Sequence, residues 1–139
     1  MSNTVLDKII LGIDYGEANI GLAFGRNGFV SPLMVISTRN EMTAIHEIIR
    51  VALENKTDFF VIGLPLGYDH RDTRQSNKVR LFSKKLKIFS KKPVEFVDEY
   101  NSTNEGLENA LGEGINKKTR RTTDQYSAGV IIKAFYESS

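Results

Sequence analysis

The apolar run Phe59–Gly63 (FFVIG) constrains the fold more than any other segment of this chain. A strand without a polar side chain buries both of its faces, which is typical of the centre of a parallel sheet. Helices then have to cover the sheet on both sides. The run therefore predicts an α/β architecture with Phe59–Gly63 in a central strand.

The hydrophobic pattern predicts four further strands. Lys8–Ile13 is a short buried strand, and the alternating segment Asn19–Phe24 is its hairpin partner. Phe29–Ile36 belongs at an edge or a bulge, because Pro32 has no N–H to donate to a ladder. Val94–Val97 is the last strand. The order βββαβαβαα predicts a five-stranded mixed sheet of order 3-2-1-4-5, flanked by helices, in which only the second strand opposes the others.

Capping patterns predict the starts of three helices. The patterns are Thr38-Arg39-Asn40-Glu41, Ser102-x-x-Glu105 and Thr122-x-x-Gln125. A further helix, from about Gln75 to Phe89, is predicted from apolar residues at helical spacing. Its inward residues are expected to be Val79, Phe82, Leu86 and Phe89.

The composition bounds the class of protein. The 139 residues suit a single domain, 1–139, because no repeat, linker or low-complexity tract divides them. With no cysteine, disulfides, zinc–thiolate sites and thiol nucleophiles are excluded, and two histidines cannot form an all-histidine metal site. Neither a run of ~20 apolar residues nor a secretory signal is found, so we expect a cytoplasmic protein that does not enter a membrane.

The net charge of +2 hides an uneven distribution. Residues 1–72 carry 6 basic and 9 acidic side chains, a net −3, whereas residues 73–139 carry 13 and 8, a net +5. Thr73–Val94 contains eight basic residues and no acid, and Ile115–Thr123 is a second acid-free run. Charge gathered in this way favours binding to a polyanion, although each run alone also fits a solvated helix face or loop.

Acidic residues stand at the ends of the predicted elements. Asp14 ends the first strand, Asp98 and Glu99 end the fifth, and Asp124 begins the last helix. Sites in open α/β sheets form at the carboxyl ends of strands, so these carboxylates could meet there. Such a group needs a hard cation, Mg²⁺ or Mn²⁺, and two such ions could act on a phosphodiester. Each acid alone equally fits a turn or capping role, so only the group indicates catalysis.

Four ordered blocks of the chain resemble the YqgF/RuvX-type family of Holliday-junction-resolvase-like proteins. The blocks are Gly12-Ile13-Asp14-Tyr15-Gly16 with Ile20-Gly21, Val61-Ile62-Gly63-Leu64-Pro65-Leu66, Asp98-Glu99 with Ser102, Thr103 and Glu105, and Thr123-Asp124-x-x-Ser127-Ala128. The resemblance implies an RNase H-like fold and a metal-dependent nuclease, with processing of the 5′ end of pre-16S ribosomal RNA as the favoured role.

The resemblance also implies roles for single residues. Asp14, Asp98, Glu99 and Asp124 are the expected catalytic residues. Asp14, Glu99 and Asp124 are the expected ligands of Mg²⁺ or Mn²⁺, with Asp98 as the second candidate on its strand. The chain departs from the family at two positions, where Tyr100 replaces an arginine and Asn19 replaces a basic residue. The first change bears on contact with phosphate.

Basic residues are the expected contacts to nucleic acid. An acidic centre repels a phosphate backbone unless cations offset it, and the tract Lys117–Arg121 immediately precedes Asp124. Backbone contact that is independent of sequence and sensitive to salt is therefore assigned to this tract, with lysines of the Gln75–Phe89 helix as an outer track. The assigned residues are Lys117, Lys118, Arg120, Arg121, Lys78 and Lys85.

Several alternatives stay open. The Gly12–Gly16 block also resembles the first phosphate loop of actin-like ATPases, but those proteins need two related lobes. A Holliday-junction resolvase acting on branched DNA would have to cut as a dimer, and the sequence does not decide between monomer and homodimer. A ribosome-assembly module that only binds nucleic acid is a third alternative. The loop Leu64–Thr73 is either a substrate-facing loop, with His70 as a phosphate or proton partner, or a solvated loop.

Overall fold

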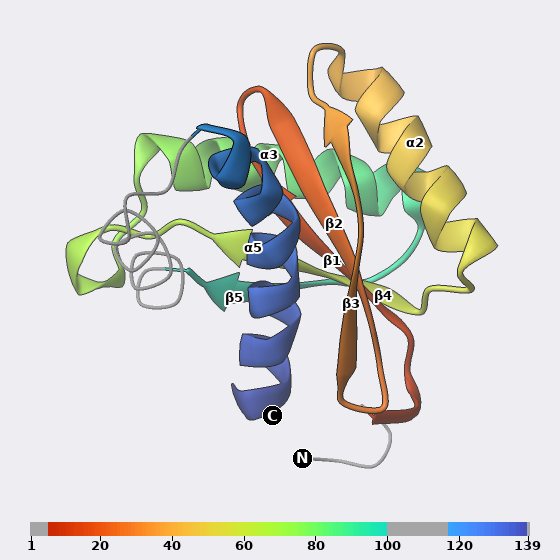
Figure 1. Cartoon of the computed structure of the whole chain (residues 1–139). Helices are drawn as coiled ribbons and strands as arrows, with labels where there is room; N and C mark the ends of the chain where they lie inside the picture. Colours follow the sequence, from red (N-terminus) through yellow and green to blue (C-terminus); the bar gives the residue numbers. More distant parts are fainter. Residues whose placement is uncertain (1–5, 100–116, 139) are drawn as a thin grey trace.

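The structure, a computed structural model, describes residues 6–99 and 117–138, and for residues 117–127 only the course of the helix (Figure 1). The elements in chain order are β1 (Ile10–Tyr15), β2 (Asn19–Arg26), β3 (Phe29–Ser37), α2 (Glu41–Glu54), β4 (Phe59–Leu64), a 3₁₀ turn η1 (Tyr68–His70), α3 (Arg74–Ser90), β5 (Val94–Asp98) and α5 (Lys117–Ser138). The helix predicted to begin at Ser102 lies outside the described residues.

The five strands form one mixed sheet of order β3-β2-β1-β4-β5, which confirms the predicted topology. β2 runs antiparallel to β1 and β3, whereas β1, β4 and β5 are parallel. β4 is flanked on both sides and its residues from Phe60 onward are buried, as an apolar run requires. The sheet therefore brings the carboxyl ends of β1, β4 and β5 to one edge.

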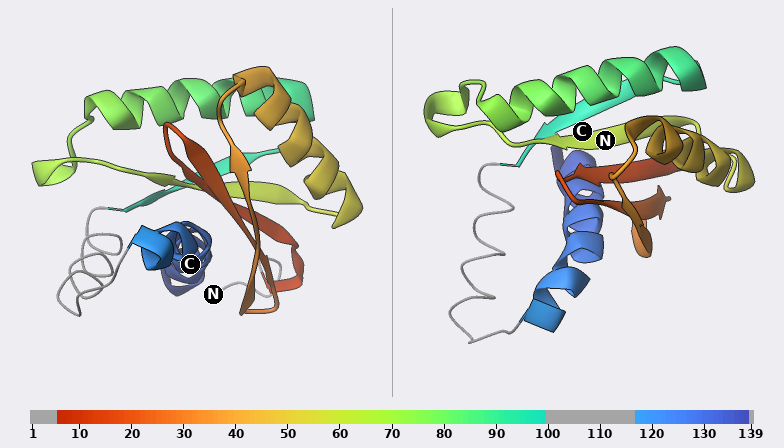
Figure 2. Two further views of the ribbon diagram at one scale, coloured as in Figure 1. Left: turned by 45° about the horizontal axis from the view of Figure 1, so that its top comes forward. Right: turned by 90° about the horizontal axis from the view of Figure 1, so that it is seen from above.

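Helices cover the two faces of the sheet unequally. α2 and α3 lie on one face, where Ile45, Ile48 and Phe82 join the larger core cluster. α5 crosses the other face, where Ala128, Ile131 and Ile132 form a smaller cluster with strand residues. Figure 2 shows α5 nearly end-on beneath the sheet, with α3 on the opposite side. Among the described residues, no helix is long and apolar enough to cross a membrane.

Two glycines let α5 approach the sheet closely. A Cβ atom added at Gly12 would lie 2.5 Å from Ile132 Cγ1, and one added at Gly25 would lie 2.7 Å from Ile132 Cγ2. Gly12 also faces the carbonyl oxygen of Ala128, at 3.0 Å from that added atom. The side chain of Ile132 therefore fills the space that side chains on β1 and β2 would otherwise occupy.

β3 is an edge strand with an irregular ladder. Leu22 pairs with Met34, but the next residue, Ala23, pairs with Pro32, so Leu33 is an extra residue in β3. Such a bulge suits Pro32, which cannot donate a ladder hydrogen bond. The expectation of an edge or a bulge is confirmed.

The predicted helix starts and one inward residue need correction. α2 is capped by Asn40, whose Oδ1 accepts from the Thr43 N–H at 3.0 Å, whereas the Thr38 hydroxyl donates to the Glu17 carbonyl at 2.7 Å. The start predicted at Thr122 is also wrong. α5 begins at Lys117, so the basic tract predicted to precede the helix lies within it. Phe89, predicted to face inward, is 52% exposed. It lies in the last turn of α3, which ends at Ser90.

Candidate active site

The carboxyl edge of the parallel strands brings two of the predicted acids together. Ile13 of β1 is in register with Ile62 of β4, so Asp14 lies beside Gly63, at the usual spacing of about 4.8 Å between neighbouring strands. A Cβ atom added at Gly63 would lie 2.4 Å from Cδ and 2.5 Å from Oε1 of Glu99. The carboxyl group of Glu99 therefore rests on Gly63, next to the position of Asp14.

Strand alternation puts these two acids on the same face of the sheet. Asp14 is two residues after Gly12, which faces α5, and side chains two residues apart on a strand share a face. Gly63 likewise follows Val61, a member of the cluster beneath α5. Glu99 is only 6% exposed and Asp14 is half-buried. The α5 face thus holds a partly buried pair of carboxylates at the end of β1 and β5.

Asp98 points the other way. It is one residue before Glu99, so its side chain lies on the α3 face, where Oδ2 contacts His70 Nδ1 in an ion-pair geometry. Its side chain is 29% exposed. The backbone of Glu99 instead continues the ladder by donating its N–H to the Leu64 carbonyl, at 3.1 Å. Of the two acids that end β5, the structure sets Glu99 beside Asp14 and Asp98 beside His70.

The backbone of α5 leads toward the same carboxyl edge. Ala128 and Ile132 lie over Gly12, whereas Tyr136 lies over Gly25, which pairs with the first residue of β1. The helix therefore runs toward the start of β1 as residue number rises. Asp124 is one turn before Ala128, about 6 Å further toward the Asp14 end. Its side chain lies outside the described residues, as do those of Lys117, Lys118, Arg120 and Arg121.

The donors at this site fit a hard cation. Carboxylate oxygens are the ligands that Mg²⁺ and Mn²⁺ prefer, and glycine at position 63 leaves room for one of them. Among the residues whose side chains are described, no group of three acids or histidines could hold a metal ion. Asp14 and Glu99 are therefore a two-carboxylate site in the described part, and the third expected ligand, Asp124, lies on the part of α5 without described side chains.

Lys78 and Lys85, the two lysines assigned to an outer track, lie on α3, which covers the face of the sheet opposite α5. Lys78 Nζ donates to Glu17 Oε1 at 2.6 Å, and Lys85 Nζ donates to Glu41 Oε2 at 3.2 Å. The ion pair with Lys78 lowers the pKa of the Glu17 carboxyl group. Both lysines extend from α3, on the face opposite α5. Their contact with nucleic acid stays a prediction, and it would compete with these ion pairs.

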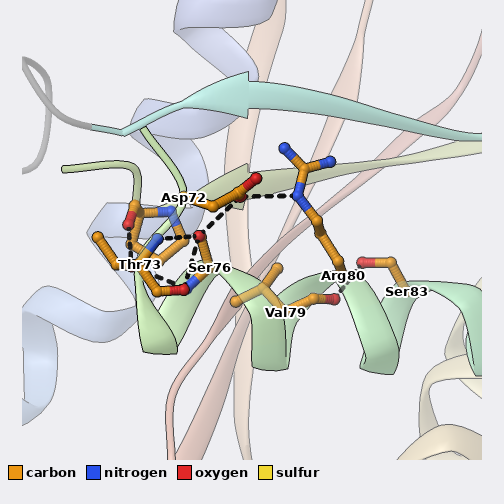
Figure 3. Close-up of polar contacts among 7 residues, drawn as sticks. Asp72, Thr73, Ser76, Val79, Arg80 and Ser83 are labelled. Atoms are coloured by element: carbon orange, nitrogen blue, oxygen red, sulfur yellow. Dashed lines mark hydrogen bonds and ion pairs between the residues drawn. The ribbon is translucent and has the colours of Figure 1, made fainter. Parts of the chain in front are cut away.

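A network of hydrogen bonds anchors α3 beside the loop that follows β4 (Figure 3). Thr73 accepts from the Ser76 N–H at 3.0 Å and donates to the Pro65 carbonyl at 2.9 Å. Asp72 Oδ1 accepts from the Ser76 hydroxyl at 2.9 Å and from Arg80 Nε at 2.8 Å. These two hydrogen bonds, that of Arg80 foremost, lower the pKa of Asp72. The carboxyl end of β4 is thereby tied to the first turn of α3.

The sequence interpretation missed the role of Gly63. It treated this residue as the end of a central strand, whereas its lack of a side chain is what admits the Glu99 carboxyl group. A glycine inside an otherwise bulky strand is a known sign of close approach by another group. That sign was present in Phe59–Gly63, and it agrees with the choice of Glu99 as the expected ligand and Asp98 as the second candidate.

Solved structures of junction-cutting enzymes share this fold. RuvC of T. thermophilus in complex with a Holliday junction superposes with a TM-score of 0.60 at 14% identity, covering 94% of this chain and 95% of that one. The fowlpox virus Holliday junction resolvase gives 0.53 at 14% identity, covering 94% and 99%. The sheet order and these neighbours define an RNase H-like fold, which confirms the expectation from the sequence.

Sequence comparison then gives the family. The RuvX family, described as Holliday junction resolvase, matches residues 8–138, so the chain belongs to this family of nucleases. A relative from Nitratidesulfovibrio vulgaris is 32% identical over 130 residues, covering 90% of each chain. A relative from Mycoplasma mobile is 34% identical over 130 residues, covering 90% of this chain and 89% of the relative. Both relatives bear the name "Putative pre-16S rRNA nuclease".

Proposed function

We propose that this protein is a divalent-metal-dependent nuclease that hydrolyses phosphodiester bonds in pre-16S ribosomal RNA. The observation that carries the proposal is the Glu99 carboxyl group resting on Gly63 beside Asp14, at the carboxyl edge of three parallel strands. The names of the relatives support the choice of RNA. Nucleic acid is the substrate class common to the family description and those names.

Asp14, Glu99 and Asp124 would hold the metal. Asp14 is the principal ligand in this proposal, because it ends the strand in the middle of the sheet. Glu99 is preorganised by burial and by Gly63, so little side-chain freedom is lost when its carboxylate binds a cation. A bound Mg²⁺ or Mn²⁺ supplies an activated water and offsets the charge of the scissile phosphate.

The other residues act on the substrate chain. Cations at the start of α5 would contact the phosphate backbone next to the carboxylates, independently of base sequence. Asp98 positions His70 on the opposite face, at the end of the same strand. His70 is thereby available to contact a phosphate that passes around the edge of the sheet.

Branched DNA is the second candidate substrate. The family description and the RuvC and fowlpox neighbours favour it, since each names the Holliday junction. Symmetric cutting of a junction requires two active sites, and hence a homodimer, whereas trimming of RNA requires one. The state of association in solution therefore separates the two candidates together with the substrate.

The decisive experiment is a cleavage assay on three substrates, namely a pre-16S rRNA fragment, an unrelated single-stranded RNA of equal length and a four-way DNA junction. Each is incubated with Mg²⁺, Mn²⁺ or EDTA. We expect cleavage of the rRNA fragment with metal, none with EDTA, and none by Asp14→Asn, which keeps the shape of the side chain and removes its charge.

Cleavage of the junction alone would assign the second candidate. Full activity of Asp14→Asn, or undiminished cleavage in EDTA, would contradict the proposed site. Circular dichroism and thermal unfolding of Asp14→Asn serve as the control that the variant folds.

A further inference from the structure

The basic residues of α3 fall into two flanks that differ in their partners. Lys78 and Lys85 face α2 and the β1–β2 turn, where Glu41 and Glu17 neutralise them. Arg80, Lys84 and Lys87, spaced at i, i+4 and i+7, face β5 instead. Within the described part of the chain, Lys84 and Lys87 take part in no ion pair. On the β5 flank Arg80 is paired with Asp72, whereas Lys84 and Lys87 keep their positive charge available.

A pocket lies between this flank and the edge strand β5. Its volume is about 230 Å³, and it is lined by Arg80, Ser83, Lys84, Lys87, Val94 and Phe96. This volume is below the ~300–1,000 Å³ typical of sites that enclose a whole small molecule. No carboxylate is among these described lining residues, so the pocket suits one unit of a longer anionic chain.

The floor of the pocket is aromatic. The Phe96 ring is 39% exposed, although it belongs to a strand. The Arg80 guanidinium lies over one face of that ring, with its carbon 5.6 Å from the ring centre, so a stacked base would share the ring with Arg80. Arg80 is held there through Nε, which donates to Asp72 at 2.8 Å, and Figure 3 shows its terminal nitrogens extending toward β5. An exposed ring beside oriented cations is the combination that binds unpaired bases by stacking and the backbone by charge.

The pocket lies near the candidate active site, on the opposite face of the sheet. Phe96 is two residues before Asp98 on the same face of β5, and Glu99 follows at once. At about 3.3 Å per residue, Phe96 lies ~10 Å along the strand from Glu99. A single strand held in the pocket would follow β5 to the carboxyl edge of the sheet and pass around this edge strand to the carboxylates on the α5 face.

We propose that the Arg80–Lys84–Lys87–Phe96 pocket binds one nucleotide of single-stranded RNA, with its base stacked on Phe96 and its phosphates held by Lys84 and Lys87. The pocket is a second substrate contact, separate from the carboxylates, and the choice of RNA rests on the proposed function. It selects unpaired over paired strands, because a base inside a duplex cannot stack on Phe96.

The test measures binding without cleavage. The full chain with Asp14→Asn, in EDTA, is titrated into fluorescein-labelled single-stranded RNA at several salt concentrations. The variant Lys84→Gln/Lys87→Gln is compared with Lys78→Gln/Lys85→Gln, which removes the same charge from the other flank of the same helix. We expect about a tenfold rise in Kd for the first variant and a smaller rise, of about threefold, for the second, because its lysines are already paired with Glu17 and Glu41. The slope of log K against log salt should fall by about 1.4 in the first, from two lost phosphate contacts.

Phe96→Leu tests the stacking. It keeps an apolar side chain and removes the ring, so we expect Kd for the single strand to rise about fivefold or more. Kd for an RNA duplex of the same length should change less than twofold. Phe96→Tyr keeps the ring and should retain the affinity of the parent, which separates loss of stacking from loss of folding.

Equal losses in the two lysine variants would overturn the proposal, as would unchanged single-strand affinity in Phe96→Leu. Unchanged affinity in all variants would equally overturn it, because RNA would then bind elsewhere. Because the readout is binding in EDTA, it stays meaningful if the parent chain cleaves no RNA. Failure of the proposed function is thus distinguishable from failure of this pocket.

Discussion

The two faces of the sheet differ most where β5 ends. Glu99 lies on the α5 face, where it is buried against Gly63 beside Asp14. Asp98, one residue earlier, lies on the α3 face and is paired with His70. Two adjacent acids of one sequence block thus have different neighbours and different exposure. Because side chains alternate along a strand, neighbours in sequence lie on opposite faces of the sheet, and only one of these two acids lies beside Asp14.

The floors of the two faces differ as well. Beneath α5 the strands carry Gly12, Gly25 and Gly63, so helix and carboxylate come close to the backbone. On the opposite face Leu11, Ile13 and other large side chains fill the space beneath α2 and α3. One face is therefore built for close approach of functional groups, and the other supplies most of the aliphatic core.

The largest expected effect is the contrast between the two acids that end β5. Glu99→Gln removes a proposed ligand charge and should lower the rate of metal-dependent cleavage by about 10³-fold. Asp98→Asn leaves the α5 face intact and should lower it by less than about tenfold. The measurement is kcat on the pre-16S rRNA fragment at saturating Mg²⁺.

Equal losses in the two variants would remove the distinction between the faces. The titration of activity with Mn²⁺ serves as a second readout, since only a ligand should shift the metal concentration needed for half-maximal activity. Asp98→Asn is expected to leave that concentration unchanged.

A smaller loss of activity is expected when Gly63, against which the Glu99 carboxyl group packs, is replaced by alanine. In Gly63→Ala the new methyl group would overlap the Glu99 carboxyl group, which must swing aside. Displacing a catalytic group by about 1 Å can cost ~10²-fold in rate. Stability should change little, because the displaced atoms are the end of a flexible side chain. We expect part of the activity to return in Gly63→Ala/Glu99→Asp, whose shorter side chain leaves room for the methyl group.

A side chain added where α5 packs closely on the sheet should lower the stability of the fold. Gly12→Ala places a methyl group against Ile132 and the Ala128 carbonyl, so α5 must shift. We expect the free energy of unfolding in urea to fall by about 1–3 kcal/mol. Gly129→Ala, on α5 itself, is the matched control. Among the described residues its added atom meets Val30 Cγ1, at 3.2 Å, and alanine favours the helix, so stability should hold or rise.

The smallest expected effect is a dependence on pH from the α3 side. The hydrogen bonds of Arg80 and Ser76 lower the pKa of Asp72 below its usual value near 4. The ionised Asp72 therefore stabilises the folded protein fully above that value, and this contribution is lost as pH falls through the lowered pKa. The stability difference between the parent and Asp72→Asn should shrink between about pH 5 and pH 3. Arg80→Gln should remove the same pH dependence, and a constant difference across this range would contradict the assignment.

Much of the sheet could be predicted from the sequence, because burial of a strand leaves a direct pattern. The apolar run Phe59–Gly63, the alternation in Asn19–Phe24 and the proline in β3 each indicate a place in the sheet. Helix starts were harder to predict. Asn40 and Thr38 are both good caps, and the choice between them depended on the Glu17 carbonyl, which is distant in sequence.

The site could be predicted only in part. Asp14, Asp98 and Glu99 were found from their places at strand ends, but their faces follow from the register of β4 with β5, which the sequence does not show. The ion pairs of Lys78 and Lys85 were also beyond the sequence, because their partners lie 61 and 44 residues away. The assignment of Lys78 and Lys85 to an outer track stays a prediction, and the structure adds that each lysine is paired with an acid.

The bulge in β3 bears on how copies of this chain can associate. An edge strand invites a second strand only when it is straight and presents a regular row of donors and acceptors. The extra residue Leu33 interrupts that row. The bulge therefore disfavours a continuous sheet formed by two copies through β3. It also disfavours edge-to-edge aggregation of the protein. An enzyme that cuts a junction symmetrically would have to pair through another surface, such as its helices or β5.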